Sequence, residues 1–352
     1  MKKRTLLILA IFFSISSNSQ DINQIREAVR SVSQPDINTL FNHYFEPLAM
    51  SASHGLNNGW YHTAKTHKKF GFDITIGVNA ASTPTSKQNF KFVASEYSEY
   101  LSVQGNREIP TIMGDDIETR MFINVPANSL KYGGTTFQHP AASATFDLFG
   151  GIGEDLPMNA IPTPTIQVGL GLPFKTDIKI RFMPNVEVEG LSSNLFGLGL
   201  QHNLMQYFGP LEKTPLNVAL LVAYTNMSVS YSFDNSPIPG SNQMAEYNVK
   251  AYTFQAIASF DFPIISLYTG MGYNIGKTNF NLLGEYEVKF NIDGIPSPVI
   301  MTYIDPLKAE YEANGFRATA GARINLGPVK IYGDYTLQEF NTVSAGVAFS
   351  FR

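Results

Sequence analysis

The sequence predicts an all-β protein, a transmembrane antiparallel up-and-down β-barrel of 12–14 strands with a short helical N-terminal plug. Three observations lead to this fold class. Residues 341–352 alternate strictly between apolar and small or polar side chains. The same two-residue period runs along the chain from about Trp60 onward. In six of the predicted strands, every charged side chain lies on the polar face. The apolar face of the last strand consists of Val343, Ala345, Val347, Phe349 and Phe351.

The composition agrees with a sheet that has one face in lipid. Only 15% of the residues are charged, compared with about 25% in soluble domains, whereas 12% are aromatic. The net charge of −4 gives no indication of nucleic-acid binding or of a polybasic membrane patch. The chain has no cysteine, which excludes a lipoprotein anchor, a disulfide framework and thiolate metal sites.

Residues 1–20 have the pattern of a secretory signal peptide. Three basic residues follow Met1, an apolar stretch covers residues 5–15, and small residues precede a predicted cleavage after Ser19 or Gln20. The apolar stretch is too short for a transmembrane helix, which needs about 20 residues. We therefore expect export, insertion by the barrel-assembly machinery, and a final location in the cell outer membrane.

Residues 21–58 form a helical region with apolar faces. After Pro35, the apolar residues are spaced 3, 1, 3, 1 and 3 apart, which is the pattern of one helix face. Such a face needs an apolar partner surface. We expect it to enter the barrel lumen as a plug or hatch; a periplasmic arm bound to another protein is the alternative. The predicted face consists of Ile37, Leu40, Phe41, Tyr44, Phe45 and Leu48.

Residues 59–352 are predicted to form the barrel. Soluble sheets also alternate between apolar and polar positions, so the period alone does not identify a membrane protein. The exclusion of charge from one face is more informative, because a Lys or Arg on a lipid face costs about 2–4 kcal/mol at the membrane midplane. Besides the terminal strand, it holds in segments 164–172, 176–190, 252–262, 315–326 and 328–338.

The connections predict which end of each strand faces the periplasm. Counting backwards from the last strand puts residues 172–175, 208–215, 262–264 and 326–328 on the periplasmic side, and each of these contains proline. Short inner turns and long outer loops are typical of outer-membrane barrels. The count also requires residues 264–290 to be one long strand. Near Gly276 the apolar side chains change from odd-numbered to even-numbered positions, and a similar change occurs near Asn226. These changes in apolar phase predict two β-bulges.

The strand number follows from the remaining segments. Ten strands are expected from residue 142 onward, and segments 59–67, 70–82, 88–97 and 118–125 add two to four. Aromatic residues at the inner strand ends would form the girdle at the membrane interface. These residues are Phe174, Phe208, Phe260, Phe262, Phe349 and Phe351.

Charged residues on the polar face are predicted to line the lumen. Both signs occur, which favours a mutually neutralising network that fills the barrel and anchors the plug over a selective permeation path. The predicted lumen charges are Lys179, Arg181, Glu187, Glu189, Arg317, Arg323, Lys330 and Asp334.

No catalytic, cofactor or metal site is predicted. Four histidines, His43, His54, His62 and His67, are spaced 11, 8 and 5 residues apart, which matches no common ligand motif. The acidic pair at residues 115–116 lacks the order of a calcium loop. The chain contains no Gly-x-Ser-x-Gly motif, so we expect no enzymatic activity.

The order of signal peptide, helical N-terminus and barrel with proline-marked inner turns resembles the FadL-type outer-membrane transporters for hydrophobic compounds. The segments 55–60, 67–73 and 169–175 also resemble an uncharacterised bacterial outer-membrane β-barrel family. The first resemblance implies a monomer in outer-membrane lipid that passively transports hydrophobic or amphipathic small molecules. The alternative is a non-enzymatic partner of an export, adhesion or envelope-assembly machine.

Overall fold

The computed structural model describes residues 34–351, except 104, 106, 126–127, 133–134, 140–141, 149, 189, 234–238, 291–298 and 306. The predicted signal peptide and the first part of the predicted plug, residues 21–33, lie outside the described residues, as does Glu189.

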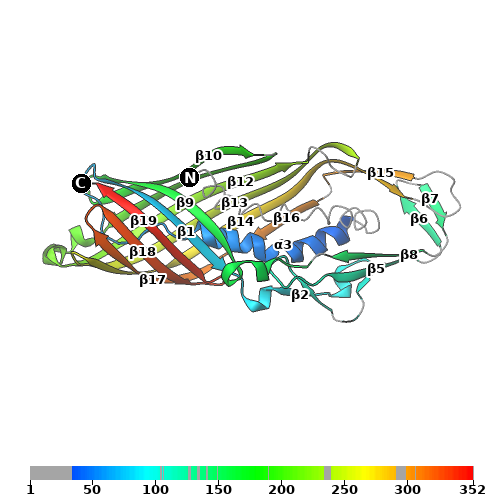
Figure 1. The fold of residues 1–352 in the computed structure, drawn as a ribbon, viewed down its shortest axis with the longest axis horizontal. Helices are drawn as coiled ribbons and strands as arrows, with labels where there is room; N and C mark the ends of the chain where they lie inside the picture. The colour runs from blue at the N-terminus through cyan, green and yellow to red at the C-terminus, as the bar shows by residue number, and fades with distance from the viewer. Residues whose placement is uncertain are drawn as a thin grey trace.

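Ten antiparallel strands close into a barrel (Figure 1), which confirms the predicted fold class. Each strand pairs with its neighbours in the ring, and the first and last strands close it, with Phe72 opposite Phe351. In ring order the strands are β1 (Phe72–Ser82), β9 (Ala160–Leu172), β10 (Thr176–Val188), β11 (Leu191–Asn203), β12 (Leu216–Ser232), β13 (Gly240–Asp261), β14 (Ile265–Phe290), β17 (Gly315–Leu326), β18 (Val329–Leu337) and β19 (Thr342–Phe351).

The strand number is ten, so the predicted range of 12–14 is wrong. Of the four additional segments, only 70–82 enters the ring, as β1, and the segment after residue 142 does not. Segment 59–67 forms no strand, because it runs through the barrel interior and is held there by lumen-facing side chains. Segments 88–97 and 118–125 and the segment after residue 142 contribute to small sheets of strands that have three to seven residues, whereas a transmembrane strand needs about 9–11. These short strands are β2 (Asn89–Lys91), β3 (Leu101–Val103), β4 (Glu108–Pro110), β5 (Thr119–Val125), β6 (Asn128–Tyr132), β7 (Thr135–His139) and β8 (Ala142–Leu148).

The two ends of the barrel differ. One end, here called the turn end, carries the chain's C-terminus and the connections 173–175, 204–215, 262–264 and 327–328 (Figure 1), which include all four predicted inner turns. The other end, the loop end, carries the long excursion between β1 and β9, together with β15 (Val299–Ile304) and β16 (Leu307–Glu312). Short 3-10 helices are η2 (Thr85–Lys87), η3 (Ala94–Glu96), η4 (Gly153–Asp155), η5 (Pro157–Asn159), η6 (Met205–Tyr207) and η7 (Gly209–Lys213).

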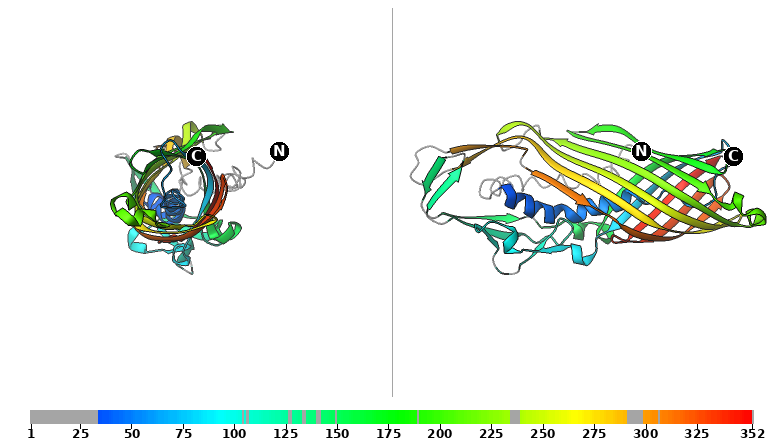
Figure 2. Two further views of the ribbon diagram at one scale, coloured as in Figure 1. Left: turned by 90° about the vertical axis from the view of Figure 1, so that its left-hand side faces the viewer. Right: turned by 180° about the vertical axis from the view of Figure 1, so that it is seen from behind.

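One α-helix, α3 (Gln34–Leu56), lies inside the loop-end half of the molecule. The view along the barrel in Figure 2 shows it within the ring of strands. It packs against β16, β9, β1, β14 and β13, so the surrounding wall covers it from several sides. Among the described residues, no helix is both long enough and apolar enough to cross a bilayer.

The long strand β14 is present as predicted, but the bulge near Gly276 is wrong. Its pairing with β13 runs without a shift through Ala251–Gly276 and Lys250–Lys277. Beyond this point the outward positions become polar, whereas inward Phe280 packs against the core around α3. The change in apolar phase therefore marks the level at which the strand leaves the lipid and begins to enclose α3.

Strand β12 repeats this arrangement at Asn226, where the second predicted bulge is also wrong. Its register with β11 and β13 is continuous on both sides of Asn226. Inward-facing Met227 and Val229 pack near the end of α3 in a cluster with Leu56. An apolar phase change thus has a second physical cause besides a bulge, namely an apolar partner inside the barrel.

The wall is apolar outside and polar inside over the part between these boundaries and the turn end. Large apolar side chains are exposed on the outer surface of every strand in the ring, whereas Arg181, Arg317 and Asp334 are buried within. A continuous exposed apolar belt of this size is not stable in water and marks a membrane-facing surface. The described strands therefore form a membrane-spanning barrel.

A charged side chain introduced into the apolar outer belt should lower the free energy of unfolding far more than one introduced on the loop-end side of the belt. We expect Met271→Arg, at a side chain that is 70% exposed on the outside of β14, to lower the free energy of unfolding by about 2–4 kcal/mol. Asn279→Arg, on the same strand past the phase change, should cost about 0–1 kcal/mol. Urea unfolding of both variants in lipid vesicles measures the difference. Equal losses would contradict the assigned boundary.

Candidate functional site in the barrel lumen

The lumen is occupied by the chain that follows α3. The helix ends at Leu56, and residues 57–67, here called the lumen segment, run through the barrel interior. Backbone bonds then attach the chain to the turn end, where the Phe70 amide donates to Gly171 at 2.8 Å before β1 begins. The site is thus formed by the lumen segment and the inward side chains that hold it.

Arg181 of β10 binds the end of α3. Its guanidinium donates to the carbonyls of Leu56 at 2.9 Å and Asn58 at 2.7 Å, and to Gln167 Oε1 at 3.1 Å. Its face lies 3.8 Å from the ring centre of Trp60. A helix C-terminus has unpaired carbonyls and a partial negative charge. A buried guanidinium donates hydrogen bonds to those carbonyls and places a positive charge beside them.

Two further cations hold the same stretch. Arg317 of β17 donates to the Asn57 carbonyl at 2.7 Å and to Asn58 Oδ1 at 2.5 Å. Lys179 of β10 donates to the Trp60 carbonyl at 2.7 Å. Because β10 and β17 are five strands apart in a ring of ten, the lumen segment is clamped from opposite walls.

Nearer the turn end, the contacts involve histidines and carboxylates. Arg323 donates to His62 Nδ1 at 2.9 Å, so that nitrogen must be the acceptor and Nε2 carries the proton. The Nε2 atom lies 3.4 Å from Asp73 Oδ2. His67 Nδ1 lies 2.9 Å from Asp177 Oδ2. The imidazoles thus connect the lumen segment to three strands of the wall.

The charges in this part of the lumen balance. Arg323 also lies 3.3 Å from Asp261, and Asp334 accepts a hydrogen bond from Tyr268 at 2.9 Å. Among the described residues, four buried cations face three buried carboxylates and the partly buried Asp261 around the lumen segment. The cations are Lys179, Arg181, Arg317 and Arg323, and the carboxylates are Asp73, Asp177, Asp261 and Asp334.

Five of the predicted lumen charges, Lys179, Arg181, Arg317, Arg323 and Asp334, thus lie in this network. The other described ones do not. Glu187 is exposed near the loop end of β10, and Lys330 lies at the turn end, where it donates to the Gly327 carbonyl. Asp73 and Trp60 were not among the predicted site residues. Asp73 could have been found from the two-residue period, which places it on the polar face of its strand, whereas no feature of the sequence marks Trp60.

Glycines in the wall make room for the aromatic residues of the lumen segment. A Cβ at Gly199 would lie 2.9 Å from the Trp60 ring, and one at Gly197 would lie 3.1 Å from it. Gly270 makes equally close room for Tyr61. These recesses let the wall approach the segment closely, which leaves Trp60 only 1% exposed.

The predicted apolar face of α3 lies in the core of the loop-end half. Leu40, Phe41 and Tyr44 are buried, with Phe45 and Leu48 partly buried against the same cluster. This cluster also includes residues of the excursion between β1 and β9, such as Ile109 and Met113. The side chain of Ile37 lies outside the described residues.

Polar bonds add to the contacts of α3 with the wall. The Asp36 carboxylate accepts from the Ser98 amide at 2.7 Å, and Ser53 Oγ lies 3.1 Å from Thr278 Oγ1 of β14. His54 stacks on Phe340 at 5.4 Å, and burial lowers the pKa of this imidazole to about 4.

The described histidines and carboxylates of the lumen and of α3 serve as contacts between elements. Within the described part of the chain, no three His, Asp or Glu side chains converge as metal ligands. His43 contacts Glu96, and His54 stacks on Phe340. His62 and His67 share Asp73, at 3.4 and 3.6 Å, and His67 also contacts Asp177. What this chemistry can do is hold a segment in place.

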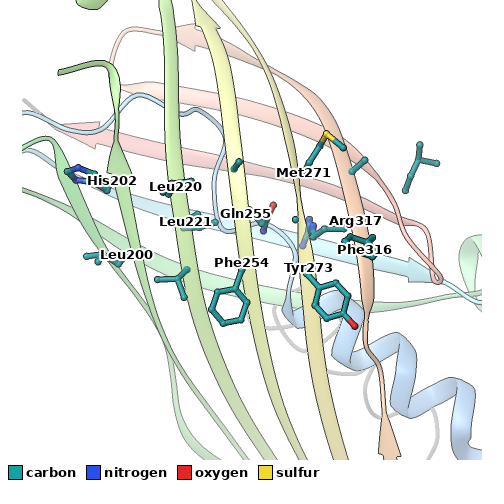
Figure 3. Close-up of a pocket in the computed structure, with 15 residues that line it drawn as sticks. Leu200, His202, Leu220, Leu221, Phe254, Gln255, Met271, Tyr273, Phe316 and Arg317 are labelled. Carbon is teal, nitrogen blue, oxygen red and sulfur yellow. The ribbon is translucent and has the colours of Figure 1, made fainter. Parts of the chain in front are cut away.

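A groove of about 960 Å³ lies on the outside of the wall, next to the clamp. Phe254, Tyr273 and Phe316 come from three adjacent strands and form one side of it (Figure 3). Its lining also includes Gly272, whose inner side is covered by Gln255, and Arg317, which also holds the lumen segment. The groove therefore shares Arg317 with the contacts that hold the lumen segment.

Comparison with known proteins gives one family and several distant barrels. A family of unknown function (DUF6588) matches residues 1–351. No curated protein matches the chain. Ail, the attachment invasion locus protein of Yersinia pestis, is 11% identical with a TM-score of 0.26, over 81% of this chain and all of Ail.

Two other solved structures are similarly distant. The Escherichia coli outer-membrane transporter YddB is 10% identical with a TM-score of 0.30, over 76% of this chain and 39% of YddB. The translocator domain of the autotransporter NalP from Neisseria meningitidis is 10% identical with a TM-score of 0.25, over 90% of this chain and 98% of that domain. Likeness at this level assigns no function.

Proposed function

The chain belongs to the family of unknown function DUF6588, and we propose that it is an outer-membrane barrel for passive transport of hydrophobic or amphipathic small molecules. In this proposal the turn end faces the periplasm and the loop end faces outward. The protein acts as a monomer in outer-membrane lipid, after export by its signal peptide and insertion by the barrel-assembly machinery. It has no enzymatic role and needs no cofactor.

The outer groove is the observation that carries this proposal. Its lining is mainly apolar, it opens to the lipid, and its floor includes the clamp residue Arg317. A ligand in this groove would lie beside Gly272 and close to Arg317, which joins the groove to the lumen segment. This arrangement suits an apolar molecule that passes sideways between the lumen and the membrane.

Transport then requires the lumen segment to move. The described segment is bonded to the wall at Asn57, Asn58, Trp60, His62 and His67, so a molecule that follows its path through the lumen has to displace it. Each broken bond to a buried charged group costs about 1.5–3 kcal/mol unless water replaces it. In this proposal the arrangement is the closed state of a gated path, and displacing the segment opens the route.

Because the natural chain has no cysteine, a disulfide can test this movement cleanly. Ser53 and Thr278 have side-chain oxygens 3.1 Å apart, and Thr63 and Ser259 have theirs 3.2 Å apart. We expect the variants S53C/T278C and T63C/S259C, when oxidised, to abolish protein-dependent uptake of N-phenyl-1-naphthylamine by cells. Reduction should restore uptake.

The four single-cysteine variants are the controls and should transport in both redox conditions. Mass analysis of the purified protein confirms the disulfide before uptake is compared. Full uptake by an oxidised, fully cross-linked T63C/S259C variant would contradict transport past a moving lumen segment.

A second candidate is a non-enzymatic partner of an export, adhesion or envelope-assembly machine. It is favoured by the loop-end half, where α3 and the excursion between β1 and β9 form a packed core beyond the membrane belt. Leu40, Phe41 and Tyr44 are buried in that core, so their exposed neighbours would have to make the contact. This candidate predicts no protein-dependent uptake and a partner that co-purifies after in-cell cross-linking.

A further inference from the structure

A basic pocket of about 740 Å³ lies at the turn end of the barrel. It is bounded by residues 65–69, by the turn between β9 and β10, by η7 and by the end of β13. Five lysines and two carboxylates line it, so its charge is strongly positive. The lysines are Lys65, Lys68, Lys69, Lys175 and Lys213, and the carboxylates are Glu212 and Asp261.

Neither carboxylate neutralises the lysines of residues 65–69. Glu212 pairs with Lys175. Asp261 is bound by Arg323 at 3.3 Å and by Thr63 at 2.8 Å. In the part of the chain that the structure describes, Lys65, Lys68 and Lys69 have no carboxylate within ion-pair distance. Three cations therefore lie close together in sequence and are exposed, without an acidic partner.

The lysine-bearing stretch is held rigidly from beneath. The His67 amide donates to Asp177 at 2.9 Å, and the His67 ring lies 2.9 Å from the same carboxylate, which is 2% exposed. The Gly71 amide donates to the Lys68 carbonyl at 2.8 Å, which closes the turn. A stretch fixed in this way loses little conformational entropy when it binds a ligand, unlike a mobile basic tail.

The pocket lies at the mouth of the barrel, between lumen-facing residues such as Asn203 and Asp261 and the outer rim. Phe174 lines it and is 81% exposed, and Phe70, next to Lys69, is 59% exposed. Tyr207 and Phe208, also at the turn end, are exposed as well. Aromatic side chains of this kind lie at the headgroup level of outer-membrane barrels. The lysines are therefore at the depth of the lipid phosphates.

We propose that this pocket binds the phosphate group of an anionic phospholipid in the leaflet at the turn end. Basic pockets at this depth attract anionic headgroups, and lysine ammonium groups bind phosphate as point charges. The aromatic residues beside the pocket contact the start of the acyl chains. The site holds a resident lipid next to the lumen segment, whose last residue is His67, and it does not depend on whether the barrel transports a substrate.

Native mass spectrometry of the full-length protein tests the site. The protein is delipidated in detergent and mixed with phosphatidylglycerol or phosphatidylcholine. We expect preferential retention of phosphatidylglycerol, a loss of about tenfold or more in K65Q/K68Q/K69Q, and weaker retention by the natural protein in high salt. The salt measurement needs no variant, so it remains decisive if the triple variant folds poorly.

The control is K250Q/K277Q/K308Q, which removes the same charge from three exposed lysines on β13, β14 and β16. It should retain phosphatidylglycerol as the natural protein does. Equal retention of the two lipids, or unchanged retention by K65Q/K68Q/K69Q, would overturn the proposal. Complete competition by inorganic phosphate at equal concentration would overturn the lipid assignment in favour of a soluble anion.

Discussion

Replacing Arg181 by alanine is expected to lower the free energy of unfolding by about 3–5 kcal/mol. The change removes the guanidinium bonds to the buried carbonyls of Leu56 and Asn58, of which the second keeps only a long bond from Asn79 at 3.4 Å, and it removes the contact with the Trp60 ring. Water that enters the space replaces only part of these bonds. Urea unfolding of the purified protein in micelles measures the loss.

The same variant should raise conductance in planar bilayers, because the end of α3 is then held mainly by Arg317 and Lys179. Two controls separate this effect from loss of charge alone. Arg181→Lys keeps the charge but not the planar fork of donors, and it should be intermediate. Lys330→Ala, which removes one exposed bond to the Gly327 carbonyl at the turn end, should leave conductance unchanged. An Arg181→Ala protein of natural stability and conductance would contradict the clamp.

Replacing Trp60 by alanine should cost about 3–5 kcal/mol, the usual range for a buried aromatic side chain cut back to alanine. The indole is 1% exposed and lies against the two-glycine recess formed by Gly197 and Gly199. Gly199→Leu alone should also destabilise, by about 1–3 kcal/mol, because the new side chain enters space that the ring occupies.

Combining Trp60→Ala with Gly199→Leu should recover stability, because the leucine fills the vacated recess. We expect a coupling energy of about 1–3 kcal/mol in the stabilising direction from unfolding of the four proteins. Gly315→Leu is the control, since a Cβ there meets no atom within 4 Å, and it should not couple to Trp60→Ala. Strict additivity of the changes at Trp60 and Gly199 would show that the ring does not fill the recess.

Much of the barrel could be predicted because strand periodicity is a local property. The outward positions of β19, the long continuous β14 and the proline-marked turns could all be read from short windows of the sequence. The phase changes at Gly276 and Asn226 were also visible there, but their interpretation as bulges was wrong. A local pattern records that the apolar side has changed, not whether the strand or its partner surface is the cause.

The strand number could not be predicted from local sequence patterns, because it depends on which strands pair in the folded protein. Residues 118–125 alternate as a membrane strand does, yet β5 has only seven residues and pairs with β3 and β8 at the loop end. The lumen site likewise depends on contacts between residues that are far apart in the sequence. Arg181 and Arg317 could be assigned to a polar face, but the sequence does not record that their strands lie on opposite walls or that both donate to residues 56–58.

The sequence by itself determined the class of fold, the two faces of most strands and which connections share an end. These features follow from side-chain alternation and turn chemistry, which act between near neighbours in the chain. Only the tertiary structure decided the closure at ten strands, the position of α3 inside the ring, and the clamp on residues 57–67. Those features depend on which residues the closed ring brings face to face across the lumen, because buried charges and carbonyls are stable only when that geometry pairs them.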